Sequence, residues 1–338
     1  MCLLAGQLLS LRASYKLGLW LALLGASAVI LWYRSFVRPI SRNQSKGAIL
    51  YTTVGEHPFE DSAFVLDLET FKKSTFLGGK SPRSYVSVSG KSLTGPMLVA
   101  TRELNESGDK VTSRLYLFDP TGQTWHAVNT FKSDALEGEG ALGPDGRTIV
   151  FTLADPANPA GYEVWWADTL TGAHRKLTTV ELGSWDAFPQ LRSDGQEVLF
   201  VRFYRTRGGI SSKLLSISSI GEREAVVLEE NEGTASACYA PDGKHIAVWT
   251  KNGLEVLTES DGARKVVLPW NSILGFKITA SRIFWSGIHD RIVFPLVKSS
   301  NKQYGIWWIS PEGQDFTRLY NGINAQISSV SVVGMQDQ

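Results

Sequence analysis

Short runs of alternating apolar and polar residues, separated by glycine-containing turns, fill the chain from about residue 47 onward, as expected for β-strands. Three of these runs align with one another, and each follows an Asp-Gly turn: GPDGRTIVFTL (residues 143–153), RSDGQEVLFVR (192–202) and APDGKHIAVWT (240–250). They lie roughly 50 residues apart, a period typical of a four-stranded propeller blade. The pattern predicts an all-β protein built from repeated four-stranded units.

The remaining strands of each unit repeat as well. An aromatic-rich strand ending in a glycine turn follows, as in YEVWWADTLTG (residues 162–172) and YGIWWISPEG (304–313). A last short strand completes the unit, as in HRKLTT (174–179). These marks divide the chain into six units, some of them degenerate at the Asp-Gly turn. The predicted units cover residues 47–79, 84–130, 138–179, 186–230, 234–270 and 281–320.

The two ends of the repeat array complement each other. The first unit lacks an innermost strand, because it opens directly with GAILYTT (residues 47–53), which corresponds to a second strand. A spare strand, QISSVSVV (326–333), follows the last unit. Pairing the two closes the ring and removes its exposed edges. We therefore predict a six-bladed β-propeller, residues 47–338, that is closed by its C-terminal strand.

The N-terminal residues differ from the rest of the chain. Residues 17–33 (LGLWLALLGASAVILWY) carry no charge, and their length is near the lower limit for a helix that spans a bilayer. Trp20 and Trp32 lie near the ends of this stretch, where interfacial aromatic residues are favoured. We expect residues 1–16 to be a short tail, residues 17–33 a transmembrane anchor, and residues 34–46 a linker. A signal peptide that is cleaved after Ala28 is the alternative.

The repeat resembles the TolB-like, WD-repeat-like β-propellers. APDGKHIAVWT, together with LGPDGRTIVFTL and GAHRKLTT, carries this resemblance, which extends over nearly all of residues 47–333. The resemblance implies the propeller fold but not one function, since such propellers include protein-binding scaffolds, domains of peptidases and sugar lyases. The basic residues flanking the apolar segment give conflicting orientations. Because propellers of this family usually lie outside the cytoplasm, we expect a single-pass membrane protein with a periplasmic propeller.

Composition and spacing narrow the possible chemistry. The net charge of +1 gives no bias toward nucleic acid, and we expect no nucleic-acid partner. The cysteines, Cys2 and Cys238, form no C-x-x-C pair, and the five histidines lie in no metal-ligand spacing. No serine lies in a nucleophile elbow. We therefore expect no catalytic residue, no metal site and no cofactor.

Acidic residues gather in consecutive connections between the predicted units. Because these connections open onto one face of the ring around the channel mouth, they would concentrate a negative field where propellers bind partners. Charged surface loops are also common without a function, so the set is either a binding site or a solvated rim. We call it the acidic arc: Asp134, Glu137, Glu139, Glu181, Asp186, Glu229, Glu230 and Glu232.

Two functions are compatible with these features. The first is a non-enzymatic scaffold at the cell envelope that binds a protein or peptide, in particular a basic one, through the acidic arc. The alternative is a carbohydrate-active enzyme or sugar-binding module that uses polar residues converging on the channel axis. The candidates for that second role are Ser84, Ser87, Glu139, Asp186, Gln190, Tyr239 and Ser329. A carboxylate-lined pocket for a metal would favour the enzyme, and a filled channel would favour the scaffold.

Overall fold

A computed structural model describes the predicted propeller region. The described residues are 47–54, 62–77, 83–90, 95–104, 111–128, 136–155, 157–221, 223–229, 233–278, 282–323 and 326–333. The predicted tail, anchor and linker, residues 1–46, lie outside them. Within the described ranges, none of the helices combines the length and the apolar character that crossing a bilayer requires.

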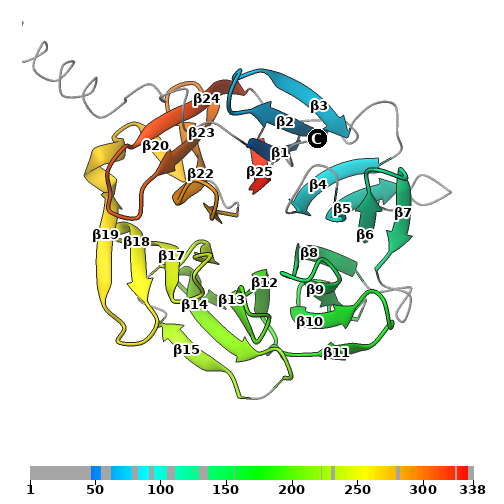
Figure 1. The fold of residues 1–338 in the computed structure, drawn as a ribbon. Helices are drawn as coiled ribbons and strands as arrows, with labels where there is room; N and C mark the ends of the chain where they lie inside the picture. The colour runs from blue at the N-terminus through cyan, green and yellow to red at the C-terminus, as the bar shows by residue number, and fades with distance from the viewer. Residues whose placement is uncertain are drawn as a thin grey trace, which may run out of the picture.

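The described strands form six antiparallel sheets arranged in a ring around a central axis, as predicted (Figure 1). In each blade the strands follow one another from the axis outward. The second blade contains β4 (Arg83–Gly90), β5 (Met97–Leu104), β6 (Val111–Asp119) and β7 (Thr124–Ala127). The third contains β8 (Leu136–Leu142), β9 (Thr148–Ala154), β10 (Tyr162–Asp168) and β11 (His174–Lys176). The fourth contains β12 (Ser184–Leu191), β13 (Glu197–Thr206), β14 (Gly209–Ser218) and β15 (Ala225–Leu228), and the fifth β16 (Ala237–Tyr239), β17 (His245–Thr250), β18 (Gly253–Thr258) and β19 (Arg264–Pro269).

The first blade joins the two ends of the described chain and confirms the predicted closure. Its innermost strand is β25 (Gln326–Val333), which pairs with β1 (Ala48–Val54) so that Ala48 lies opposite Val333. The outer strands are β2 (Ser62–Asp67) and β3 (Lys73–Leu77). The hydroxyl oxygens of Thr52 and Ser329 are 2.7 Å apart, which adds a buried side-chain hydrogen bond to the closing ladder.

The sixth blade has a broken innermost strand. Both β20 (Phe276–Ile278) and β21 (Phe284–Ser286) pair with β22 (Arg291–Lys298), and the sheet continues with β23 (Tyr304–Ile309) and β24 (Thr317–Ile323). A short 3-10 helix, η3 (Trp270–Ile273), precedes it. The sequence analysis placed the start of this unit at residue 281. In the structure the blade begins earlier, at Phe276 of β20.

The hydrophobic core is divided into clusters that lie between neighbouring blades. Strand β23 shows how this arrangement follows from the sequence. Successive side chains of a strand point to opposite faces of the sheet, so Trp307 packs toward the fifth blade and Trp308 toward the first. Both tryptophans are buried, and each stabilises a different blade interface.

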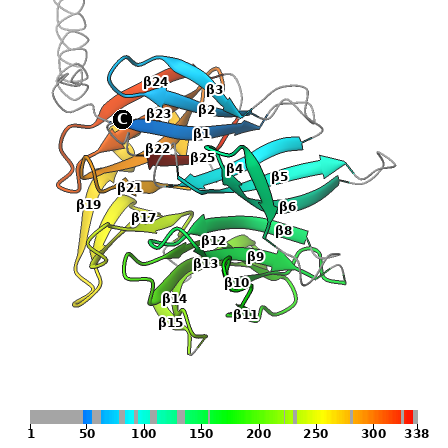
Figure 2. The same ribbon diagram turned by 45° about the vertical axis from the view of Figure 1, so that its right-hand side comes forward.

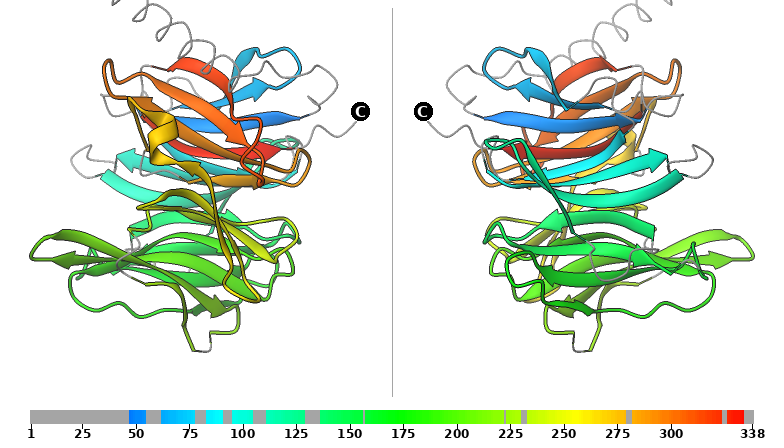
Figure 3. Two further views of the ribbon diagram at one scale, coloured as in Figure 1. Left: turned by 90° about the vertical axis from the view of Figure 1, so that its left-hand side faces the viewer. Right: turned by 90° about the vertical axis from the view of Figure 1, so that its right-hand side faces the viewer.

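The two faces of the ring differ in what they carry. On the turn face, the Asp-Gly turns are held by aspartate side chains: Asp194, for example, accepts a hydrogen bond from the backbone N–H of Gln196 at 2.9 Å. Both ends of the described chain lie on this face, because β1 begins where β25 ends. The opposite face, the loop face, carries the connections between blades. The hairpin of β13 and β14 projects from the body of the ring at the loop face (Figures 2 and 3).

Candidate functional site: the central channel and its two openings

The structure places the acidic arc differently from the sequence prediction. Glu137 and Glu139 lie in β8 and Asp186 in β12, which are innermost strands, whereas the sequence assigned them to loops. Both strands begin before the predicted starts of their units, and each carries an irregularity in its register. Glu181 and Glu229 lie on exposed connections, as expected. Asp134, Glu230 and Glu232 lie outside the described residues.

Glu137 is buried and fully engaged within the protein. Its carboxylate accepts hydrogen bonds from the backbone N–H of Leu115 and from the Arg114 guanidinium, the latter at 3.4 Å. A carboxylate bound in this way contributes little net field at the surface, because its charge is balanced by Arg114. Its position indicates that Glu137 joins the second and third blades.

Asp186 is likewise buried, and it belongs to a network of three charged groups. It accepts hydrogen bonds from Nε of Arg202 at 2.6 Å and from Nη2 at 3.0 Å, and Arg202 also contacts Glu224 at 2.7 Å. Thr178 donates its hydroxyl to Asp186 at 2.6 Å. Burial alone would lower the pKa of Arg202, but the hydrogen bonds to Asp186 and Glu224 raise it above its ordinary value. Arg202 therefore stays charged and holds β12 to β13.

Glu139 forms an ion pair that crosses the channel. Its carboxylate lies 3.3 Å from Nε of Arg282, which precedes β21, and Nη2 of Arg282 donates to the backbone carbonyl of Pro189 at 3.0 Å. The bridge thus connects the third, fourth and sixth blades. Solvent reaches 28% of the Glu139 side chain and 13% of Arg282. Burial raises the pKa of Glu139 and lowers the pKa of Arg282, with their mutual attraction opposing both shifts.

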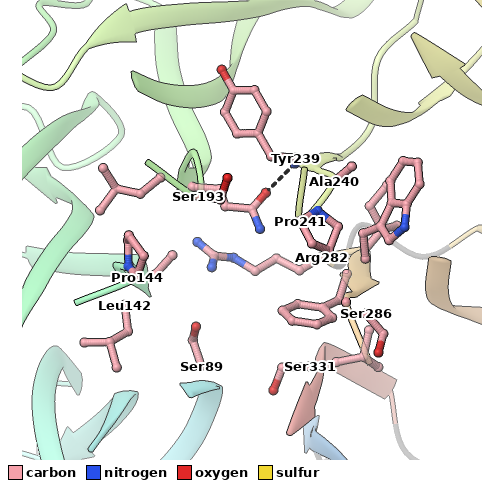
Figure 4. Close-up of a pocket in the computed structure, with 18 of the residues that line it drawn as sticks. Ser89, Leu142, Pro144, Ser193, Tyr239, Ala240, Pro241, Arg282, Ser286 and Ser331 are labelled. Carbon is pink, nitrogen blue, oxygen red and sulfur yellow. Dashed lines mark hydrogen bonds between the residues drawn. The ribbon is translucent and has the colours of Figure 1, made fainter. Parts of the chain in front are cut away.

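The two partners of the bridge line two different cavities. The loop-side cavity, about 200 Å³, has Glu137, Glu139 and Asp186 among its lining residues, and each of the three is paired with a different arginine. The turn-side cavity, about 420 Å³, has Arg282 among its lining residues (Figure 4). Sequence reasoning missed Arg282, although an arginine beside the apolar Ile283 of a predicted innermost strand is a signal that could have identified it.

The other channel candidates have mainly structural partners. Gln190 accepts a hydrogen bond from the backbone N–H of Tyr239 at 2.8 Å, and both residues line the turn-side cavity. Ser329 bonds to Thr52 in the closing ladder, and Ser87 is buried. The side chain of Ser84 lies outside the described part of the structure. In the described ranges, no three His, Cys, Asp or Glu side chains group in a way that could hold a metal ion.

The burial of Glu137 leads to a testable contrast within the acidic arc. Replacing Glu137 with lysine should lower the free energy of unfolding by at least about 2 kcal/mol, because it leaves the N–H of Leu115 unpaired and buries a second cation beside Arg114. Glu181→Lys, at an exposed position, should change it by no more than about 0.5 kcal/mol. Urea denaturation measures both. Equal stability of the two variants would contradict the structural role of Glu137.

Known proteins resemble this chain in fold but not significantly in sequence. No protein-family model matches the chain, and no curated protein is significantly similar to it in sequence. Among solved structures, TolB from Acinetobacter baumannii superposes with a TM-score of 0.64 at 15% identity, covering 85% of this chain and 66% of that one. The chain therefore spans just under two thirds of the length of that TolB.

Two further solved structures extend the comparison. A protein from Agrobacterium tumefaciens assigned as TolB gives a TM-score of 0.59 at 12% identity, with 87% of this chain and 99% of that chain covered. An oligogalacturonate lyase in complex with manganese gives 0.53 at 13% identity, with 82% and 75% covered. Identities at this level establish the fold alone. The chain has the fold of the TolB-like six-bladed β-propellers.

Proposed function

We propose that the chain is a membrane-tethered propeller that binds a protein or peptide partner at the cell envelope and catalyses no reaction. The observation that carries this proposal is an exposed surface on the loop face. It is formed by residues 180–183 and by the tip of the β13–β14 hairpin, residues 205–210, and we call it the docking surface. Leu182 is 94% exposed and Ile210 66% exposed.

The two segments that carry these apolar side chains are joined through the backbone. The backbone N–H of Arg205 donates to the carbonyl of Gly183 at 2.9 Å, and Arg205 pairs with Ile210 across the hairpin. Single exposed apolar residues are normal, but two of them on joined segments of one face are compatible with an interaction site.

Stacked aromatic residues beneath the docking surface and charged residues near it are also compatible with a binding role. The rings of Trp185 and Phe203 stack at 5.4 Å in the strands that lead to the docking surface. Glu181 adjoins Leu182, and Glu229 lies 3.6 Å from Lys213 on β14. Protein interfaces commonly combine an apolar centre with a polar rim. The exposed Glu181 carboxylate would face a basic partner, whereas Glu229 contacts Lys213 and the carboxylates of Glu137 and Asp186 are occupied by arginines.

The position of the chain ends supports a tethered arrangement. The predicted anchor and linker, residues 17–46, precede Gly47, and Gly47 lies on the turn face beside Leu68. We infer that the turn face lies toward the membrane and that the docking surface points into the compartment, which we propose is the periplasm. The acidic residues of the loop-side cavity are paired with arginines, and the likeness to the lyase concerns the fold, so neither favours the carbohydrate-active alternative.

Site-specific cross-linking tests this function. A photo-activatable residue at position 182 should form an adduct with a partner in intact cells, whereas the same residue at position 170 should not. Leu170 is a matched control, because it is 76% exposed but lies in a turn on the opposite face. Replacing Ile210 with aspartate should reduce the adduct at least about tenfold, as expected for a central interface residue. An adduct insensitive to this change, or equally strong at position 170, would refute the docking surface.

A further inference from the structure

The charged side chains that line the turn-side cavity are all cationic. Its charged lining residues are Arg192 and Arg282, and no carboxylate is among the described residues that line it. The other polar lining side chains are uncharged: Gln190, Tyr239 and the serines Ser89, Ser193, Ser286 and Ser331, contributed by different blades (Figure 4). A cavity with cationic and hydroxyl groups on an apolar wall favours an anion with an apolar body.

The two arginines are not equivalent. Arg192 contacts three carboxylates, with Asp194 at 3.0 Å, Glu197 at 2.5 Å and Glu259 at 3.4 Å. Its charge is therefore more than compensated within the protein. Arg282 contacts only one carboxylate among the described residues, that of Glu139.

Arg282 also has hydrogen-bond donors that find no acceptor among the described residues. A guanidinium group has five N–H donors, and the contacts with Glu139 and Pro189 use one at Nε and one at Nη2. Among the described residues, Nη1 has no acceptor. In Figure 4 the Arg282 side chain extends into the middle of the cavity, so these donors are directed where a ligand can reach them. A carboxylate matches the planar geometry of such donors.

The cavity also offers space and apolar contacts for the rest of a ligand. Its volume of about 420 Å³ lies within the range of small-molecule sites. Phe188, Leu191 and Phe284 contribute to the wall, and the exposed Ile288 lies at its edge. These side chains would accommodate an aliphatic group attached to the carboxylate.

We propose that the turn-side cavity binds the carboxylate group of a ligand with an apolar body, with Arg282 as the residue that binds the anion. Two sources share this chemistry: a free aliphatic acid and the C-terminal carboxylate of a peptide that ends in an apolar residue. The site lies on the face opposite the docking surface and does not depend on the proposed scaffold function.

The ion pair with Glu139 gives the proposal a distinctive consequence. The Glu139 carboxylate partly neutralises the guanidinium that the ligand would bind and repels the ligand carboxylate, so neutralising Glu139 should strengthen binding. A purely structural bridge would make Glu139→Gln neutral or harmful to binding. The sign of the change therefore separates a ligand-binding arginine from a structural one.

Calorimetric titration of the full chain in detergent provides the test. The probes are 3-methylbutanoate and the tripeptide acetyl-Ala-Ala-Leu with a free carboxylate, each compared with its amide. We expect the acids to bind at least about tenfold more tightly than the amides, because only the acids form charge-assisted hydrogen bonds. Arg282→Met should remove this difference, and Glu139→Gln should increase the affinity for the acids severalfold. Arg147→Met, an exposed arginine on the same face that pairs with Asp168, is the control and should bind normally.

The relative affinities of the probes identify the ligand class or overturn the proposal. Tighter binding of the peptide acid than of the free acid would identify a peptide terminus as the ligand, and the reverse would identify a small acid. Equal binding of acids and amides, or no binding of either acid at millimolar concentration, would overturn the proposal. If Arg282→Met fails to fold, the comparison of acids with amides and the affinity of the Glu139→Gln variant still test whether the cavity binds a carboxylate. A variant with Leu182→Asp and Ile210→Asp should retain carboxylate binding, so failure of the docking surface is distinguishable from failure of this site.

Discussion

Deletion of residues 326–338 is expected to abolish cooperative folding of the propeller. These residues include β25, whose pairing with β1 provides the innermost strand of the first blade. The deletion removes Ile327 and Val330 from a buried cluster and leaves the apolar strand β1 as an open edge. Burying each such side chain contributes about 1.5–3 kcal/mol, and the lost ladder adds to this, against a total stability of about 5–15 kcal/mol for a typical domain. The soluble yield and the urea unfolding transition measure the effect.

A shorter truncation controls for the loss of the C-terminus itself. Deleting residues 334–338 leaves β25 intact and should preserve the wild-type unfolding midpoint. Val330→Asp keeps the full length and should be destabilising, because it buries a charge in the closing interface. A soluble protein with a cooperative transition after deletion of 326–338 would show that closure by β25 is dispensable.

Replacement of Arg202 with leucine is expected to lower the free energy of unfolding by about 3–5 kcal/mol, the usual cost of breaking a buried ion pair from one side. The variant leaves the buried Asp186 carboxylate without the two hydrogen bonds that Arg202 donates, and it also frees Glu224. Chemical denaturation of wild type and variant measures this loss.

Arg205→Leu is the matched control, since Arg205 lies on the same strand but is exposed at the hairpin tip. It should change stability by no more than about 0.5 kcal/mol. Adding Asp186→Asn to Arg202→Leu should recover part of the loss, because no uncompensated charge then remains buried. If Arg202→Leu and Arg205→Leu are equally stable, the network does not hold β12 to β13.

Repetition and alternation in the sequence were sufficient to predict the propeller. The Asp-Gly turns and the strands after them are local features, in which a side chain satisfies backbone groups two residues away and apolar positions alternate with the pleat. The missing strand before Gly47 and the spare one at residues 326–333 likewise predicted the closure. The broken innermost strand of the sixth blade was not predicted, because β20 and β21 are each too short for a clear alternating pattern.

The sequence alone did not distinguish buried charged residues from exposed ones. Glu137, Asp186 and Arg202 appear in it as ordinary charged residues near turns, like Glu181 and Arg205. Their burial depends on partners that come from other strands, such as Arg114 for Glu137, and the strand register that brings them together is a long-range property. The acidic arc was therefore predicted as one surface, and the structure divides it into buried ion pairs and exposed groups.

The sequence by itself determined the fold class, the number of blades and the closing strand, because these follow from short-range periodicity repeated along the chain. Only the tertiary structure placed Arg282 opposite Glu139, since these residues are 143 positions apart and meet because closure of the ring brings the third and sixth blades to one axis. The same closure created the two cavities, and the blade order set residues 180–183 and 205–210 on the face opposite the ends of the described chain. These features depend on how the blades are arranged around the axis, which no local pattern specifies.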